Sequence, residues 1–214
     1  PDCVPCVVDL GPGSPTGLAF GYPPAFPAPY RNALFAADWT FATIYAIHLS
    51  PDGATYSGVA EPFVGGVGLP VTDMVANGDG ALYFTVGGRR LGGAVYRIVY
   101  RGSEVTVDPL EPAWNPEQEA AHATRQRLET PLRSTGADAL EEAFAHLNAD
   151  DRSLRYAARV LLEAHPLSSW RERVLSSEPF SWNGALALAR VSVDPRDAAI
   201  IRARFAAENW ANPH

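Results

Sequence analysis

Two short segments of the sequence carry side chains suited to binding a sugar or an anion. Arg89 and Arg90 follow Gly87-Gly88 in an expected loop between two strands, and paired guanidiniums can hold a carboxylate or a sulfated sugar. Asp38 and Trp39 occupy a comparable loop, where an indole ring can stack on a sugar while a carboxylate bonds its hydroxyls. Each set also fits a structural role, in which the arginines pair with neighbouring acids and Trp39 packs against a sheet edge.

The cysteines and histidines form no motif for metal or nucleophilic chemistry. Cys3 and Cys6 are spaced C-x-x-C, but Val7 follows them in place of the histidine that haem attachment needs. A local disulfide or two free thiols fits this pair, with metal or redox chemistry as the alternative. Four histidines have no partner at catalytic spacing, which predicts surface or packing positions for them: His48, His122, His146 and His165.

Composition excludes several classes of function. The net charge of -7 argues against nucleic acid as a partner. No apolar run reaches the roughly 18 residues of a membrane span. Reading the 17 basic residues in turn finds only arginines, which excludes a Walker-type phosphate loop and Schiff-base catalysis within these residues. The sequence begins at Pro1 without a leader, so we expect any signal peptide to lie outside it.

The first half of the chain, to about residue 108, has the pattern of strands and turns. Short alternating apolar runs are separated by turn signals such as Ser50-Pro51-Asp52-Gly53 and Asn77-Gly78-Asp79-Gly80. The expected strands cover residues 4–10, 16–20, 33–37, 43–49, 56–64, 71–76, 81–86, 94–100 and 104–107.

These strands repeat at an offset of about 50 residues. Residues 15–20, 33–35 and 43–47 match residues 70–75, 81–84 and 94–98 in order and type. The period predicts a partial β-propeller of about two four-stranded blades over residues 1–108. Two blades alone would leave apolar faces open, so we interpret the chain as a fragment. The alternative is a small self-contained β-sandwich.

The second half has the punctuation of helices. Asn115-Pro116-Glu117 supplies an N-cap, a first-turn proline and a first-turn acid. Apolar residues of the helix expected at 150–164 fall on one face, which leaves Arg152, Arg155, Arg159 and Glu163 mainly outward. The expected helices cover residues 116–129, 137–147, 150–164, 168–176, 182–191 and 195–208. They predict HEAT-like α-helical repeats over residues 114–214, joined to the β half by a stiff Pro-rich linker at 109–113. The predicted fold class is therefore multidomain, β followed by α.

Several motifs resemble the last blades of glucose/sorbosone dehydrogenase-type β-propellers. They are residues 14–20, the segment from Phe26-Pro27 to Phe35, and the stretch from Thr72-Asp73-Met74 to Tyr83. The ending from Gly87-Gly88-Arg89 to Tyr96-Arg97, leading into helices, is similar to the large secreted dehydrogenase-like proteins of planctomycete-type bacteria. The likeness covers about half of the chain.

This resemblance implies an extracytoplasmic, periplasmic or secreted, bacterial oxidoreductase acting on sugars or alcohols. It also implies pyrroloquinoline quinone and calcium as cofactors, and a cytochrome module in the parent protein. The quinone-binding members have an Arg-x-Arg-Asp motif where this chain has Pro70-Val71-Thr72-Asp73, and a lysine near Asp38-Trp39-Thr40. Thr72 and Asp73 thus join Asp38, Trp39, Arg89 and Arg90 as candidate ligand-binding residues. Asp73 also fits a structural role, capping its turn or pairing with an arginine.

Two functions remain open at this point. The first is a fragment of a propeller-type dehydrogenase whose catalytic residues lie mostly outside this chain. The second is a non-catalytic binding or scaffolding protein for a carbohydrate or protein ligand. No residue of this chain is predicted to be catalytic and none to bind a metal.

Overall fold

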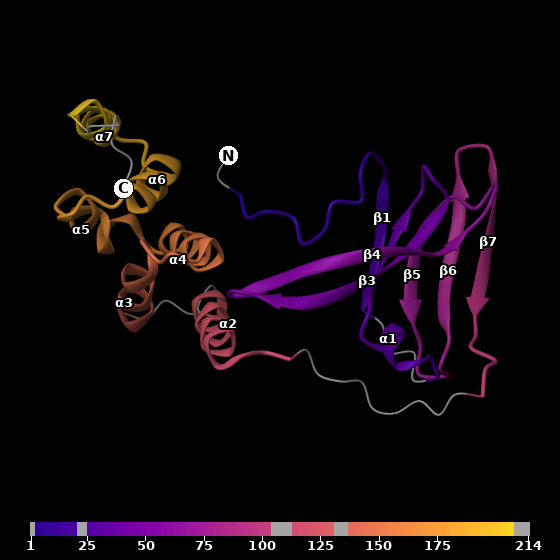
Figure 1. Cartoon of the computed structure of the whole chain (residues 1–214). Coiled ribbons are helices and arrows are strands. Elements are labelled where there is room, and N and C mark those ends of the chain that lie inside the picture. Colours follow the sequence, from indigo (N-terminus) through magenta and orange to yellow (C-terminus); the bar gives the residue numbers. More distant parts are fainter. Residues whose placement is uncertain (1–2, 21–24, 104–112, 131–136, 208–214) are drawn as a thin grey trace. The chain divides into compact units, whose positions relative to one another are not determined.

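The chain forms two compact units in the computed structural model, which describes residues 3–20, 25–103, 113–130 and 137–207 (Figure 1). The β unit consists of Pro5–Asp52 and Tyr56–Asn115. The α unit consists of Pro116–His214 together with Pro1–Val4 and the hairpin tip Gly53–Thr55.

The β unit contains two antiparallel sheets, of four and three strands. The first has the order β1-β2-β3-β4 and the second the order β5-β6-β7. The four-residue helix α1 (Ala28–Arg31) lies between β1 and β2 in the chain. The strands are β1 (Pro15–Phe20), β2 (Leu34–Asp38), β3 (Thr43–Asp52), β4 (Thr55–Gly65), β5 (Val71–Ala76), β6 (Leu82–Gly88) and β7 (Leu91–Ile98).

One hydrophobic core serves both sheets. Successive side chains of a strand point to opposite faces of the sheet, so residues two apart point to the same face. The buried members are Phe35, Ala37, Ile44 and Ala46 from the first sheet, Val71, Met74, Leu82, Phe84 and Val86 from the second, and Phe26 and Ala33 from the segment between β1 and β2. Because this cluster draws on both sheets, neither sheet covers its apolar face with its own residues alone. Burying each large side chain contributes roughly 1.5–3 kcal/mol.

The two sheets meet where β1 approaches β5. The Thr16 hydroxyl donates a hydrogen bond to the Val71 carbonyl oxygen at 2.7 Å. A Cβ atom at Gly17 would lie only 2.9 Å from Asp73 Oδ1 and 3.0 Å from Asp73 Cα. Glycine at position 17 therefore permits the close approach of the two strands.

The predicted partial propeller of two four-stranded blades is wrong. The two small sheets are unequal, with four strands and three, and are not closed or propeller-like. The physical reason is that a strand period specifies where strands begin and which side chains face inward, but not how successive sheets associate. The coarser expectation of a β part followed by an α part holds.

The individual strands were predicted more closely than their assembly. Residues 71–76 form β5 as expected, and the other expected strands from 16 to 100 shift by up to three residues at their ends. Residues 4–10 form no strand. The strand expected at 104–107 lies outside the described residues, as does the linker expected at 109–113 apart from Ala113.

The α unit is built from helices of unequal length. They are α2 (Pro116–Glu129), α3 (Ala137–His146), α4 (Arg152–Ala164), the 3-10 turn η2 (Leu167–Ser169), α5 (Arg171–Leu175), α6 (Trp182–Val191) and α7 (Pro195–Ala207). Between α4 and α6, of 13 and 10 residues, α5 has only five. This irregularity does not fit the expected HEAT-like repeat, which needs similar helix pairs. Within the described residues no helix is long and apolar enough to cross a membrane.

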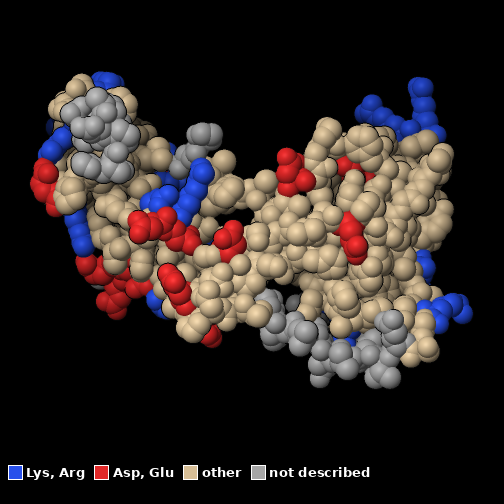
Figure 2. Space-filling view, viewed as in Figure 1, with Lys and Arg blue, Asp and Glu red and all other residues tan. Residues whose placement is uncertain are grey.

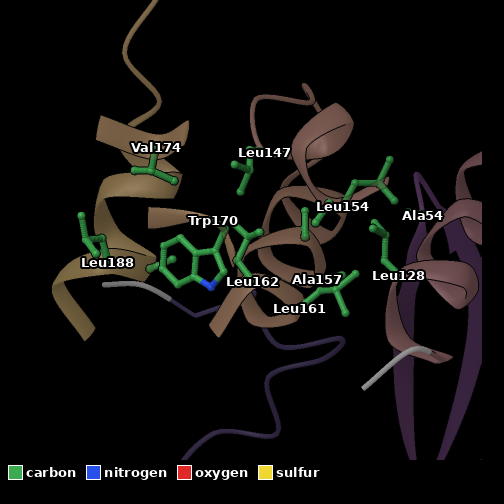
Figure 3. Packing of buried hydrophobic residues seen from close by; sticks show 13 residues of the cluster. Ala54, Leu128, Leu147, Leu154, Ala157, Leu161, Leu162, Trp170, Val174 and Leu188 are labelled. Atoms are coloured by element: carbon green, nitrogen blue, oxygen red, sulfur yellow. The ribbon is translucent and has the colours of Figure 1, made fainter. Parts of the chain in front are cut away.

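The core of the α unit is centred on α4 (Figure 3). As predicted, Leu154, Ala157, Ala158, Leu161 and Leu162 are buried. Trp170 is 1% exposed, and its indole nitrogen donates to the His165 carbonyl oxygen at 3.3 Å.

Arg159 differs from the expected outward position, because its side chain is buried and forms an ion pair with Glu163. The aliphatic stem of an arginine can enter a core when its charge finds a partner.

Asp151 fixes the start of α4. Its Oδ1 accepts hydrogen bonds from the backbone N–H groups of Ser153 at 2.7 Å and Leu154 at 3.1 Å. Its Oδ2 accepts a third from Ala54 N at 2.7 Å, within the α unit. This N-cap satisfies donors that would otherwise lack partners at the helix terminus.

Replacing Asp151 with alanine should lower the unfolding free energy of the α unit by about 1–2 kcal/mol, because three backbone donors lose their acceptor. Urea denaturation followed by circular dichroism at 222 nm measures this loss. Asp150→Ala is the matched control, since the side chain of Asp150, next to Asp151 in the sequence, is exposed and caps no helix. An equal loss in both variants would contradict the capping role.

Candidate functional site

The β2–β3 turn and the β6–β7 turn lie next to each other in the β unit. The Trp39 indole N–H donates a hydrogen bond to the Gly87 carbonyl oxygen at 2.8 Å. A Cβ atom at Gly88 would lie 3.0 Å from Trp39 Cζ2, so the indole packs against the bare backbone of Gly88. This contact places Trp39 beside the turn that carries Arg89 and Arg90. We call these three residues the rim.

Asp38 supports the rim from below. It is 4% exposed, and its Oδ1 accepts a hydrogen bond from Phe41 N at 2.9 Å while its Oδ2 accepts one from Ser14 N at 3.2 Å. The Trp39 backbone N–H in turn donates to the Ser14 carbonyl oxygen at 3.0 Å. The carboxylate of Asp38 therefore holds the turn, and its predicted sugar contact stays a prediction.

Arg89 and Arg90 form a two-residue turn between β6 and β7. Gly88 pairs with Leu91 across the turn, and both arginine side chains are exposed. Basic side chains project at the end of the β unit where this turn lies (Figures 1 and 2). Among the described residues no carboxylate forms an ion pair with either guanidinium.

The backbone of Arg90 is strained, with φ of 63°. This left-handed conformation disfavours residues with a bulky side chain and is tolerated best by glycine and asparagine. Strain of this kind persists where the surrounding structure or a function maintains it.

Arg90→Asn should raise the unfolding free energy of the β unit by ~1 kcal/mol, because asparagine accepts the left-handed conformation more readily. Thermal or urea unfolding of the β unit followed by tryptophan fluorescence tests this. Arg89→Asn, at a position without positive φ, should leave the stability unchanged. A loss of stability in Arg90→Asn would contradict the strain.

Thr72 and Asp73 do not join the rim. The Thr72 hydroxyl hydrogen-bonds the Thr85 hydroxyl at 2.8 Å across β5 and β6. Asp73 Oδ1 accepts a hydrogen bond from Met74 N at 2.8 Å. Both side chains thus make contacts within the second sheet, and Asp73 lies next to Gly17 of β1.

The donor set of the β unit does not fit pyrroloquinoline quinone and calcium. At the positions that match the family's paired arginines stand Pro70 and Thr72, and neither can supply a guanidinium for a quinone carboxylate. Asp73, the acidic position of that motif, accepts a hydrogen bond from the backbone N–H of Met74. Among the described residues no group of three or more His, Cys, Asp or Glu side chains is arranged to hold a metal ion. No mechanism through these cofactors follows from the side chains that are present.

A second polar cluster lies at the other end of the first sheet. His48 Nε2 of β3 lies 3.1 Å from Glu61 Oε1 of β4, and the Tyr30 hydroxyl of α1 hydrogen-bonds the same carboxylate. We call these three residues the clasp. The sequence predicts a surface or packing position for His48, because no partner stands at catalytic spacing. The only available signal was that β3 and β4 form a hairpin, which brings residues 13 positions apart together.

Two further features carry no residue of the rim. Cys3 of the α unit and Cys6 of the β unit are free and exposed thiols. A shallow groove of about 340 Å³ lies between the ends of β1 and β5, lined by Leu18–Phe20 and Met74–Gly78. It is opposite the rim along these strands, because Pro15 at the other end of β1 pairs with Asp38.

Comparisons with protein-family models, with curated proteins and with solved structures find no match to the chain. The likeness to glucose/sorbosone dehydrogenases therefore stays a prediction from the motifs alone.

Proposed function

We propose that the chain is a non-catalytic binding protein whose β unit takes an anionic carbohydrate at the rim. The observation that supports this most strongly is the hydrogen bond from the Trp39 indole to the Gly87 carbonyl oxygen. It brings an aromatic face and two guanidiniums without ion-pair partners among the described residues to one edge of the unit.

The three side chains serve different parts of such a ligand. A sugar ring stacks its C–H face on the indole of Trp39, and this residue is 37% exposed. Arg89 and Arg90 pair with a sulfate or carboxylate through charge-assisted hydrogen bonds. Because these guanidiniums are exposed, their contribution weakens as salt is added.

The dehydrogenase activity, the cytochrome partner and the extracytoplasmic location remain predictions from the family resemblance. We favour binding over oxidation because the candidate residues that come together are suited to recognition. The positions that would hold the quinone carry no guanidinium.

Isothermal titration calorimetry with a heparin-derived tetrasaccharide tests the proposal. The wild-type chain should bind it more tightly than the desulfated, N-acetylated tetrasaccharide. This difference in affinity should shrink as NaCl rises from about 50 to about 500 mM, because salt screens exposed charges. Trp39→Ala should weaken binding roughly tenfold, and Arg89→Gln with Arg90→Gln by about as much again.

Two matched variants separate the rim from general effects. Arg101→Gln removes an exposed arginine beyond the other end of β7 and should leave the affinity unchanged. Trp39→Phe keeps an aromatic face but loses the indole N–H, so it should fall between wild type and Trp39→Ala. Equal affinity for both tetrasaccharides, or equal loss in Arg101→Gln and the rim variants, would overturn the proposal.

Gly88→Val should weaken the same binding without removing any group that touches the ligand. Its side chain would meet Trp39 Cζ2 within 3.0 Å of the new Cβ, which displaces the indole and breaks its hydrogen bond to Gly87. We expect a loss of roughly three- to tenfold in affinity. Gly92→Val is the control, since a Cβ there has open space. Unchanged affinity in Gly88→Val would show that the position of the indole does not matter.

A further inference from the structure

The clasp joins three elements of the β unit through one carboxylate. The Glu61 carboxylate of β4 lies 3.1 Å from His48 Nε2 of β3 and accepts a hydrogen bond from the Tyr30 hydroxyl of α1. The Tyr30 ring also lies 6.0 Å from the His48 ring between centroids. The side chains of His48 and Glu61 are 36% and 46% exposed, so solvent protons reach the cluster directly.

Helix α1 depends on contacts from outside itself. Four residues are too few for a stable isolated helix, and its N-cap Pro27 makes no side-chain capping bond. The backbone N–H groups of Tyr30 and Arg31 both donate to the Pro27 carbonyl oxygen, at 3.0 and 3.2 Å. These two amides therefore report whether α1 is formed.

The position of α1 also affects an aromatic cluster at the edge of the core. The Phe63 ring lies 5.1 Å from the Tyr30 ring and 4.9 Å from the Phe35 ring, measured between centroids. Phe26, just before α1, lies 6.1 Å from Phe63. Tyr30 thus links the polar clasp to apolar packing, and its release would loosen both.

We propose that Tyr30, His48 and Glu61 form an acid-sensitive clasp that holds α1 against the β3–β4 hairpin and releases it when Glu61 is protonated. This device is independent of ligand binding at the rim, and its test requires no ligand.

The direction of the pH dependence follows from the hydrogen bonds to Glu61. Two hydrogen bonds, the larger effect coming from His48 and the smaller from Tyr30, lower the pKa of Glu61 below its ordinary value of 4.5. A carboxyl group with a lowered pKa contributes stability above its ordinary value, and loses it as the pH falls through the lowered value. The bond to Glu61 raises the pKa of Tyr30 above its ordinary value of 10.0, so the tyrosine hydroxyl keeps its proton throughout the neutral and acidic range and Glu61 is the group that titrates there.

The titratable groups that act on Glu61 come from both packed elements. They are His48 of β3, through a hydrogen bond and its charge when protonated, and Tyr30 of α1. Protonation of His48 strengthens its attraction to ionised Glu61, so the loss of the clasp in acid comes from Glu61 itself.

Amide hydrogen exchange by NMR tests the clasp, with protection factors at Tyr30 and Arg31 measured from pH 7 to pH 3. In the wild type these factors should fall roughly three- to tenfold below pH 4.5, as a partly exposed charge-assisted cluster allows. Amides in β2 and β3 should stay protected, which separates local opening of α1 from global unfolding. In Glu61→Gln and Tyr30→Phe the low protection should already be present at pH 7 and should not change with pH.

Asp79→Asn supplies the matched control. The Tyr83 hydroxyl donates to Asp79 Oδ2 at 2.7 Å, so this variant also removes a carboxylate that accepts from a tyrosine in the β unit, in this case between β5 and β6. Asp79→Asn should keep the wild-type pH profile of amide protection at Tyr30 and Arg31. The clasp is overturned if the wild-type protection does not change with pH, if Glu61→Gln behaves as the wild type, or if Asp79→Asn loses the profile.

Discussion

The hydrogen bond from the Trp39 indole to the Gly87 carbonyl oxygen is the interaction on which the proposed function depends. It joins residues 48 positions apart and fastens the β2–β3 turn of one sheet to the end of β6 in the other. Its geometry requires a bare backbone at Gly88, a buried Asp38 that shapes the turn, and a shared core that keeps both sheets in register. Without it, the indole and the two arginines would be separate exposed side chains, each of which pays its own ordering entropy on binding.

Polar side chains also fix the ends of other elements, whose centres are held by apolar packing. Asp38 secures the β2–β3 turn, Asp151 the start of α4, and Glu61 the short helix α1. In the α unit, Asp197 is 1% exposed and accepts hydrogen bonds from Arg171 and Ser192, which tie α5 to the start of α7. Hydrogen bonds from Arg196 lower the pKa of nearby Asp194 to about 2, so this turn keeps its charge through mild acid.

Local structure could be predicted from the sequence because it depends on local chemistry. Alternation placed β5 at 71–76, the proline at position 116 and the first-turn acids placed α2, and the 3-4 spacing of leucines and alanines identified the buried face of α4. Long-range association could not be predicted in the same way. The strand period led to propeller blades, whereas the structure has two unequal sheets. Rim residues were identified by type, but nothing in the sequence indicates that Trp39 meets Gly87, that Arg159 is buried beside Glu163, or that Glu61 faces His48.

The proposed function requires Trp39, Arg89 and Arg90 to act together as one binding surface. Chemical-shift mapping of the ¹⁵N-labelled chain during titration with a sulfated heparin tetrasaccharide tests it most directly. We expect the signals of the Trp39 indole N–H and of the backbone amides of Gly88, Arg89, Arg90 and Leu91 to shift together along one saturating curve, while those of the amides around the β1–β5 groove stay in place. Saturable shifts located elsewhere, with the Trp39 indole unchanged, would contradict it.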